Sequence, residues 1–186
     1  MREIETKITG TTNFARIWYK QEELILKAAG TFQSRIDSYT KRTDRRFIDR
    51  LEQAKPSTKE ALNKAWFGYE NPNPSHYDSM RYHAINLNNV WRIGTVEVRA
   101  FNGTTHAGEV KTHIQLCLMI AAKALTAKCA STKNQRPYCA ESAKYDMRVF
   151  LLRLSMNGPE FKTARHHLLK DLPGSTAWKH GRPAGR

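Results

Sequence analysis

Two short runs of alternating polar and apolar residues in the middle of the chain constrain its fold more than any other feature. Residues 82–88 and 95–101 change the apolar spacing from a helical period to a period of two, and a polar link ending in Gly94 separates them. Runs of this length joined by a turn are typical of an antiparallel hairpin. The flanking segments keep helical spacing, so the sequence predicts a mostly helical α+β fold with one short antiparallel β-hairpin.

Helical spacing is clear on the N-terminal side of this hairpin. It predicts a helix over residues 13–29 stopped by Gly30, and then a broken helix over residues 35–54 among many charges. Ser57 followed by Glu60 is typical of a capping box that opens a third, short helix. The Asn-Pro segment at residues 71–75 ends this helical part.

On the C-terminal side, Thr105 is placed to cap a helix over residues 106–128. This segment is apolar on most sides, which predicts a buried helix. Two more helices are expected over residues 144–154 and 159–172. Residues 1–172 are therefore expected to form one domain, followed by a flexible basic tail over residues 173–186.

The net positive charge of the chain favours an anionic partner. The alternative is that the basic residues only form a solvated surface. The chain has 31 Lys plus Arg against 17 Asp plus Glu, a net charge of +14 in 186 residues. Residues 1–93 hold 16 basic and 11 acidic groups (+5), whereas residues 94–186 hold 15 and 6 (+9). Nucleic acid, nucleotide phosphates and acidic substrates are all compatible with such a surplus.

The length of the apolar runs and the number of cysteines limit where in the cell the protein is expected. The longest apolar run, near residues 116–122, is far shorter than the roughly 20 residues of a membrane span, so no membrane partner is expected. Three cysteines cannot all pair, which favours the reducing cytoplasm, and their spacing matches no zinc site. Buried or idle thiols are the expectation.

Glu97 and Arg99 are the strongest candidates for chemistry. In a strand, residues two apart share a face, so the carboxylate and the guanidinium should project together, roughly 6–7 Å apart along the strand. One interpretation is a surface ion pair worth at most about 1 kcal/mol. The other is a functional pair, in which the carboxylate holds a divalent cation and the arginine grips phosphate or carboxylate oxygens.

The sequence around this pair resembles the amidoligase family, relatives of glutamine synthetase and the glutamate–cysteine ligases. The resemblance rests on residues 81–88 and 94–111, and extends to residues 20–24, 114–118, 150–154 and 160–165. It covers nearly all of the chain from about residue 13. It implies the C-terminal half of a glutamine-synthetase-like fold, with an antiparallel sheet whose concave face holds ATP and Mg²⁺.

The same resemblance implies an activity and its residues. The implied reaction is ATP-dependent ligation of a small-molecule or peptide carboxylate to an amine through an acyl phosphate. Carried over by position, Glu97 is a metal ligand, Arg99 and Arg81 bind phosphate or carboxylate, and Asn86 is a polar site residue on the neighbouring strand. Residues near them that serve packing, capping or backbone geometry on the plainer interpretation are His83, Gly103, Thr104, Thr105, His106 and Gly108.

The chain also departs from the family pattern. The strands expected to carry a Glu-x-Glu pair and a His-x-His pair are absent, so the chain is expected to be truncated at its N-terminus relative to the family. One glutamate makes a poor magnesium site. Glu3 and Glu5 would supply further carboxylates on one face if their segment were a strand.

A second function follows from this departure: a non-catalytic basic module that binds nucleic acid or a nucleoprotein, like small anti-CRISPR-type inhibitors carried by mobile elements. No helix-turn-helix, zinc finger or RNA-recognition signature is present, so such binding would read sequence poorly. The sequence leaves the oligomeric state open. The residues expected to contact phosphates are Lys123, Lys128, Lys133, Arg136, Lys162, Arg165 and Lys170.

Overall fold

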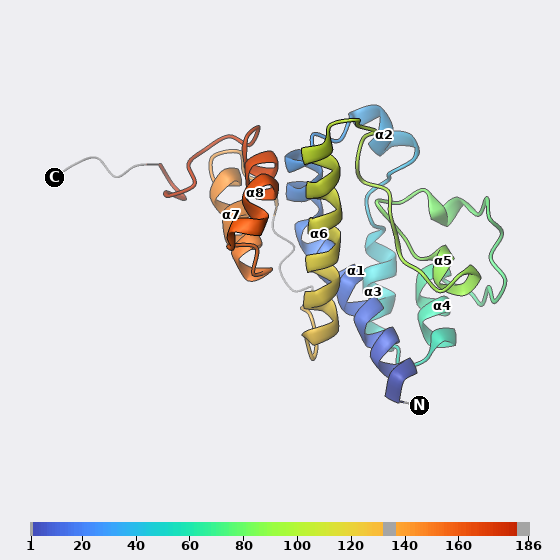
Figure 1. The fold of residues 1–186 in the computed structure, drawn as a ribbon. Coiled ribbons are helices and arrows are strands. Elements are labelled where there is room, and N and C mark those ends of the chain that lie inside the picture. The colour runs from blue at the N-terminus through green and yellow to red at the C-terminus, as the bar shows by residue number, and fades with distance from the viewer. Residues whose placement is uncertain (1, 132–136, 182–186) are drawn as a thin grey trace. The chain divides into compact units, whose positions relative to one another are not determined.

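A computed structural model describes residues 2–131 and 137–181, with side chains from Lys7 onward. The chain is mostly helical and has one two-stranded antiparallel sheet, which confirms the α+β prediction (Figure 1). The elements are α1 (Arg2–Ala28), α2 (Gln33–Ser38), α3 (Arg45–Ala54), α4 (Lys59–Phe67), η1 (Ser79–Arg81), β1 (Ile85–Asn86), α5 (Asn88–Arg92), β2 (Glu97–Val98), α6 (Ala107–Thr126), α7 (Ala143–Arg153), η2 (Pro159–Phe161) and α8 (Lys162–Leu169).

The chain divides into two compact units. Unit 1 contains Met1–Glu22, Phe32–Ala100 and Ile120–Gln135, and unit 2 contains Glu23–Thr31, Phe101–Met119 and Arg136–Arg186. Unit 1 therefore holds both strands and the helices α2 to α5, whereas unit 2 holds α7 and α8. Each of the long helices α1 and α6 contributes one part to each unit.

The N-terminal helices follow the predicted order. Helix α1 covers the predicted segment and ends where Gly30 adopts a φ of +61°, although it starts earlier, at Arg2. The broken helix is confirmed as α2 and α3. The predicted cap at Ser57 is wrong, because the neighbouring Thr58 is extended and its side chain accepts the backbone N–H of Ala61.

The sheet is antiparallel, as predicted, but much shorter. Its register pairs Ile85 with Val98 and Asn86 with Glu97, and each strand has two residues in place of seven. The predicted link contains α5, because the side-chain oxygen of Asn86 accepts the backbone N–H of Asn88 at 2.9 Å. Such local bonds compete with ladder pairing and end the strand.

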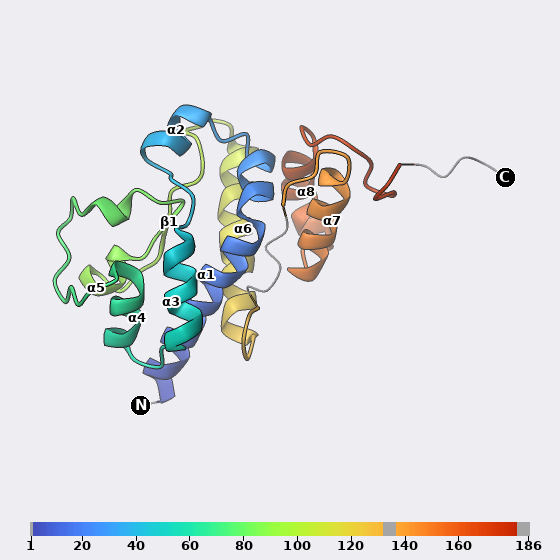
Figure 2. The same ribbon diagram turned by 180° about the vertical axis from the view of Figure 1, so that it is seen from behind.

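Aromatic packing holds the core of unit 1. Trp18, Phe47 and Trp66 are almost completely buried, and the rings of Phe47 and Trp66 meet edge to face at 4.8 Å. Phe47 comes from α3 and Trp66 from α4, the two helices that lie side by side in Figure 2. Edge-to-face geometry is a preferred arrangement of aromatic pairs and adds to the stabilisation from burial.

Helix α6 is buried along one stripe only, so the prediction of a buried helix is confirmed for that stripe and wrong for the other sides. Leu116 and Ile120 are completely buried, whereas Ile114 and Leu118 are 55% and 61% exposed. The predicted cap at Thr105 is also wrong, because α6 begins at Ala107 and the residue directly before it, His106, accepts the backbone N–H of Glu109 at its Nδ1.

Unit 2 is built on the pair α7 and α8, which lie side by side in Figure 1. Both helices were predicted, and the Pro159 expected in a first turn opens η2 just before α8. Met147 on α7 and Leu168 on α8 are almost completely buried, and the carbonyl of Pro173 accepts the backbone N–H of Lys144. Within the described residues, no helix has both the length and the apolarity needed to cross a bilayer.

The buried carboxylate of Glu22 provides a stability test for unit 1. It accepts hydrogen bonds from Trp18 Nε1 at 3.0 Å, Thr43 N at 2.9 Å and Thr43 Oγ1 at 2.7 Å. Glu22→Ala would leave buried donors unpaired, and we expect a loss of about 2–4 kcal/mol in the free energy of unfolding, measured by urea denaturation. The exposed Glu60→Ala serves as control, and an equal loss in both variants would contradict this role.

Candidate functional site

Glu97 and Arg99 form an ion pair at the edge of the sheet. Arg99 Nη1 donates to Glu97 Oε1 at 2.9 Å, with side chains that are 16% and 35% exposed, respectively. The predicted projection of both groups to one side is therefore confirmed. Glu97 is the first residue of strand β2, and Arg99 is the residue that directly follows this strand.

Two amides complete the surroundings of the Glu97 carboxylate. Asn86, its partner in the β1–β2 register, donates from Nδ2 to Glu97 Oε2 at 2.8 Å, and Asn89 Nδ2 donates to the same oxygen at 3.2 Å. The structure thus brings the predicted Asn86 to the pair. Asn89 was not predicted. The only indication in the sequence was that Asn89 lies three residues after Asn86, because one turn of helix brings residues at this spacing close together.

The guanidinium of Arg99 is held on several sides. Its Nε donates to the carbonyl of Tyr39 at 3.2 Å, and its Cζ lies 5.7 Å from the centre of the Tyr82 ring. The Arg99 carbonyl accepts from Thr40 Oγ1 at 2.6 Å and from Arg35 Nη2 at 3.0 Å. These contacts fix both the backbone and the side chain of Arg99, which is the rigidity that a binding group needs.

Arg81 approaches the same aromatic ring. Its Cζ lies 5.5 Å from the Tyr82 ring centre and 5.7 Å from that of Tyr77, while its Nη1 donates to the carbonyl of His76 at 2.9 Å. Arg81 and Arg99 therefore both contact Tyr82. The shared ring was missed by sequence reasoning, because contacts to aromatic faces have no fixed spacing along the chain.

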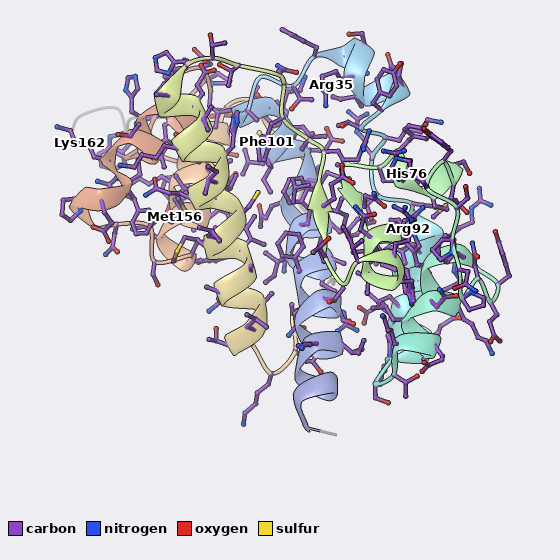
Figure 3. The ribbon with its side chains drawn as sticks, turned by 45° about the vertical axis from the view of Figure 1, so that its right-hand side comes forward. Arg35, His76, Arg92, Phe101, Met156 and Lys162 are labelled. Carbon is purple, nitrogen blue, oxygen red and sulfur yellow. The ribbon has the colours of Figure 1, made fainter. Side chains whose placement is uncertain are left out.

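A third arginine extends this cationic surface. Arg92, at the end of α5, lies 2.9 Å from His76 Nδ1 through its Nη1, and both are labelled in Figure 3. Tyr39 and Tyr77 are 56% and 76% exposed beside these cations. Guanidinium groups bind carboxylates and phosphates through paired N–H donors, and aromatic faces accept flat rings. Arginines and exposed aromatic rings are thus the residue types that the phosphate groups and the base of a nucleotide need.

The residues at Glu97 do not fit a magnesium ion. Both carboxylate oxygens already accept hydrogen bonds, and the surrounding groups are N–H donors. Mg²⁺ requires several oxygen ligands in octahedral geometry. Within residues 7–131 and 137–181, Glu97 belongs to no cluster of three potential metal ligands. The condition under which Glu3 and Glu5 would share a strand face is not met, because both residues lie in helix α1, which begins at Arg2.

The residues proposed to contact nucleic acid differ in how far they are engaged. Lys123, Lys128 and Lys162 are exposed. Arg165 donates from Nη1 to the carbonyls of Met156 and Gly158, which makes it part of the fold of unit 2. Lys170 lies 3.5 Å from Glu109 and 3.8 Å from Asp171. Lys133 and Arg136 lie outside the described residues.

The cysteines are free, but they are not all buried. Cys129 and Cys139 are exposed, so of the expected buried or idle thiols these two are not buried ones. Cys117 is half-buried, and burial raises the pKa of its thiol to about 12. Hydrogen bonding to Ser142 lowers the pKa of Cys139. The thiol of Cys139 is therefore more reactive than that of Cys117.

A comparison with known protein families gives one match. The family described as "Putative amidoligase enzyme" matches residues 8–121, which is 114 of the 186 residues and includes the Glu97–Arg99 pair. No curated protein and no solved structure matches the chain.

His83, next to Tyr82, predicts a pH dependence of stability. Burial lowers its pKa below the ordinary 6.5, and Lys41 acts in the same direction, against the bond to the Met80 carbonyl and the charge of Asp44. The unfolded chain therefore binds more protons than the folded chain, so the free energy of unfolding should fall as the pH drops below about 6.5.

We expect His83→Gln to reduce the loss of Tm between pH 7 and pH 5, measured by differential scanning calorimetry. The exposed His180→Gln is the control and should keep the wild-type slope. An unchanged slope in His83→Gln would show that other groups cause the pH dependence.

Proposed function

Because the chain belongs to the amidoligase family, we propose that it joins a carboxylate to an amine at the Glu97–Arg99 pair, with ATP as the activating substrate. The single observation that supports this site is the position of two arginines on one ring: Arg99 and Arg81 both contact Tyr82, and Arg99 is also paired with Glu97. This arrangement lies inside the matched residues 8–121.

In this proposal ATP supplies a γ-phosphoryl group that converts the carboxylate into an acyl phosphate, from which the amine displaces phosphate. Arg99 and Arg81 bind the anionic oxygens and stabilise the charge that shifts during transfer. Tyr39 and Tyr77 offer exposed ring faces beside them. Asn86 and Asn89 hold the Glu97 carboxylate, so that Glu97 orients the Arg99 guanidinium.

Glu97 is thus proposed as a positioning residue, and no step is assigned to a metal ion at this carboxylate. The proposal extends to the fold: β1 and β2 would correspond to part of the nucleotide-binding sheet of glutamine-synthetase-like enzymes. The shortness of the two-residue ladder is compatible with this correspondence, because the paired residues Asn86 and Glu97 are themselves part of the proposed site.

Phosphate release in the presence of Mg-ATP, a panel of carboxylates and amines tests the proposal. Arg99→Lys removes the planar fork and Glu97→Gln removes its charged partner, and each should lower the rate by about 100-fold or more. Arg153→Lys, an exposed arginine on α7, should leave the rate unchanged. Circular dichroism checks that the variants fold.

Isothermal titration separates loss of chemistry from loss of binding. Wild-type protein should bind ATP, and Arg81→Ala should weaken that binding, because it removes one of the two guanidinium groups at Tyr82. If the wild-type chain binds no Mg-ATP at millimolar concentrations, activity of the isolated chain is refuted.

The second candidate function is binding of nucleic acid or a nucleoprotein. The observation that favours it is the +9 charge of residues 94–186 together with the exposed Lys123 and Lys128 near the end of α6. Contacts of this kind release counterions, so affinity should fall steeply as salt rises.

Fluorescence anisotropy with a labelled DNA duplex measures this affinity. The double variant Lys123→Gln/Lys128→Gln should bind more weakly and with a smaller salt slope. The double variant Lys59→Gln/Lys64→Gln removes the same charge from exposed positions on α4 and should bind as the wild type does. No binding at low salt, or binding that salt does not change, would contradict this function.

A further inference from the structure

Two histidines and a glutamate meet at the start of helix α6 in unit 2. His106 precedes the helix, Glu109 lies in its first turn, and His167 comes from α8. One potential ligand atom from each residue lies within 4.8 Å of the others. We propose that these residues bind a divalent transition-metal ion of the zinc type. The ligand set is independent of the Glu97–Arg99 pair and of the function proposed for it.

The imidazole of His167 carries the first supporting observation. Its side chain is 12% exposed, and its Nδ1 is buried without a hydrogen-bond partner within the described part of the chain. This nitrogen lies 4.0 Å from Glu109 Oε1, too far for a hydrogen bond. A buried polar atom without a partner is costly, and a metal ion would satisfy it.

The carboxylate of Glu109 is oriented for the same task. The Thr104 hydroxyl donates to its Oε2 at 2.8 Å, which leaves Oε1 on the side of His167. A hydrogen-bonded carboxylate is the usual form of a metal-binding one, because the outer bond fixes its direction.

Gly108 provides the space in which the two rings meet. A Cβ atom at this position would lie 2.6 Å from His167 Nε2 and 2.9 Å from His106 Cε1. Gly108 is not among the glycines with positive φ, so backbone strain does not require a glycine here. The ring centres of His106 and His167 are 5.0 Å apart. Absence of a side chain at residue 108 therefore keeps the cluster open.

The chemistry of the donors selects the metal. Two imidazole nitrogens with one carboxylate oxygen suit zinc, iron, cobalt and nickel, whereas magnesium and calcium prefer oxygen alone. Three protein ligands leave at least one coordination position for water or a substrate oxygen. His106 is exposed, so this open position is accessible from solvent.

Binding requires a small closure of the cluster. Ligand atoms about 2.0–2.2 Å from one zinc ion lie about 3.3–3.5 Å apart. In the present structure His167 Nδ1 and Glu109 Oε1 are 4.0 Å apart. The exposed His106 can rotate once the long bond from Glu109 N to its Nδ1, 3.3 Å, is released. The ion would also displace Lys170, whose Nζ lies 3.5 Å from Glu109 Oε1 and has Asp171 as a second partner.

The test uses the full chain, freed of metal with a chelator and titrated with zinc chloride by isothermal calorimetry. His106→Ala and His167→Ala should each weaken zinc binding by about 100-fold. His166→Ala is the matched control, because His166 is the exposed neighbour of His167 on α8, and it should bind as the wild type does. Lys170→Gln removes a competing cation and should tighten binding.

Cobalt spectroscopy identifies the ligands, because exposed Cys129 and Cys139 are alternative zinc ligands. A visible cobalt spectrum without thiolate charge-transfer bands, retained in Cys129→Ser/Cys139→Ser and lost in His106→Ala, supports the site. Thiolate bands, or equal weakening by His166→Ala and His106→Ala, would overturn it. So would the absence of zinc binding at 100 μM, a concentration of roughly 100 times a micromolar Kd.

Thermal unfolding with and without zinc separates a loss of zinc binding from a loss of stability. His106 is exposed and its bond to Glu109 N is long, so its replacement should lower the zinc-free Tm only slightly while the rise of Tm on adding zinc disappears. Gly108→Ala introduces a methyl group between the rings and should abolish zinc binding in the same way. A full zinc-induced rise of Tm in either variant would contradict the assignment.

Discussion

The buried carboxylate of Glu22 is the interaction on which the arrangement of unit 1 depends. It ties helix α1 to Thr43 through the backbone N–H and the hydroxyl of that residue. The segment just before Thr43 in turn holds the site: Thr40 Oγ1 donates to the Arg99 carbonyl, and Lys41 exchanges two backbone hydrogen bonds with residues 82 and 84. A charged group is costly to bury unless its oxygens are fully hydrogen-bonded, so this carboxylate strongly favours one position of the segment.

The candidate site is therefore held mostly by loop contacts. The ladder of β1 and β2 pairs two residues on each side, which alone would be marginal in water. Arg99 donates from Nε to the Tyr39 carbonyl, and Thr40 and Arg35 donate to the Arg99 carbonyl. These bonds replace the missing strand neighbours. This explains how a sheet of minimal length can fix the directions of Glu97 and Arg99.

The sequence was informative where periodicity or alternation controls geometry. Helices α1, α3, α4, α7 and α8, the antiparallel pairing, and the common side of Glu97 and Arg99 all follow from local patterns. Strand length did not, because side-chain bonds of Asn86 and Asn88 end the ladder locally. The double contact of Tyr82 and the approach of His167 to His106 depend on tertiary packing, which single-sequence patterns do not encode.

The two clusters differ in the sign of the ligand proposed for each, and this difference follows from their polar atoms. Around Glu97 the neighbours are amide and guanidinium N–H groups, which satisfy its carboxylate and are donors of the kind that an anion needs. Around His167 the available atoms are a lone imidazole nitrogen and a carboxylate oxygen, which are acceptors and electron-pair donors for a cation. A strongly basic chain repels cations at long range, so retention of a cation requires direct coordination. Hydrogen-bond donors gathered in one unit and metal ligands gathered in the other thus give the two units complementary binding chemistry.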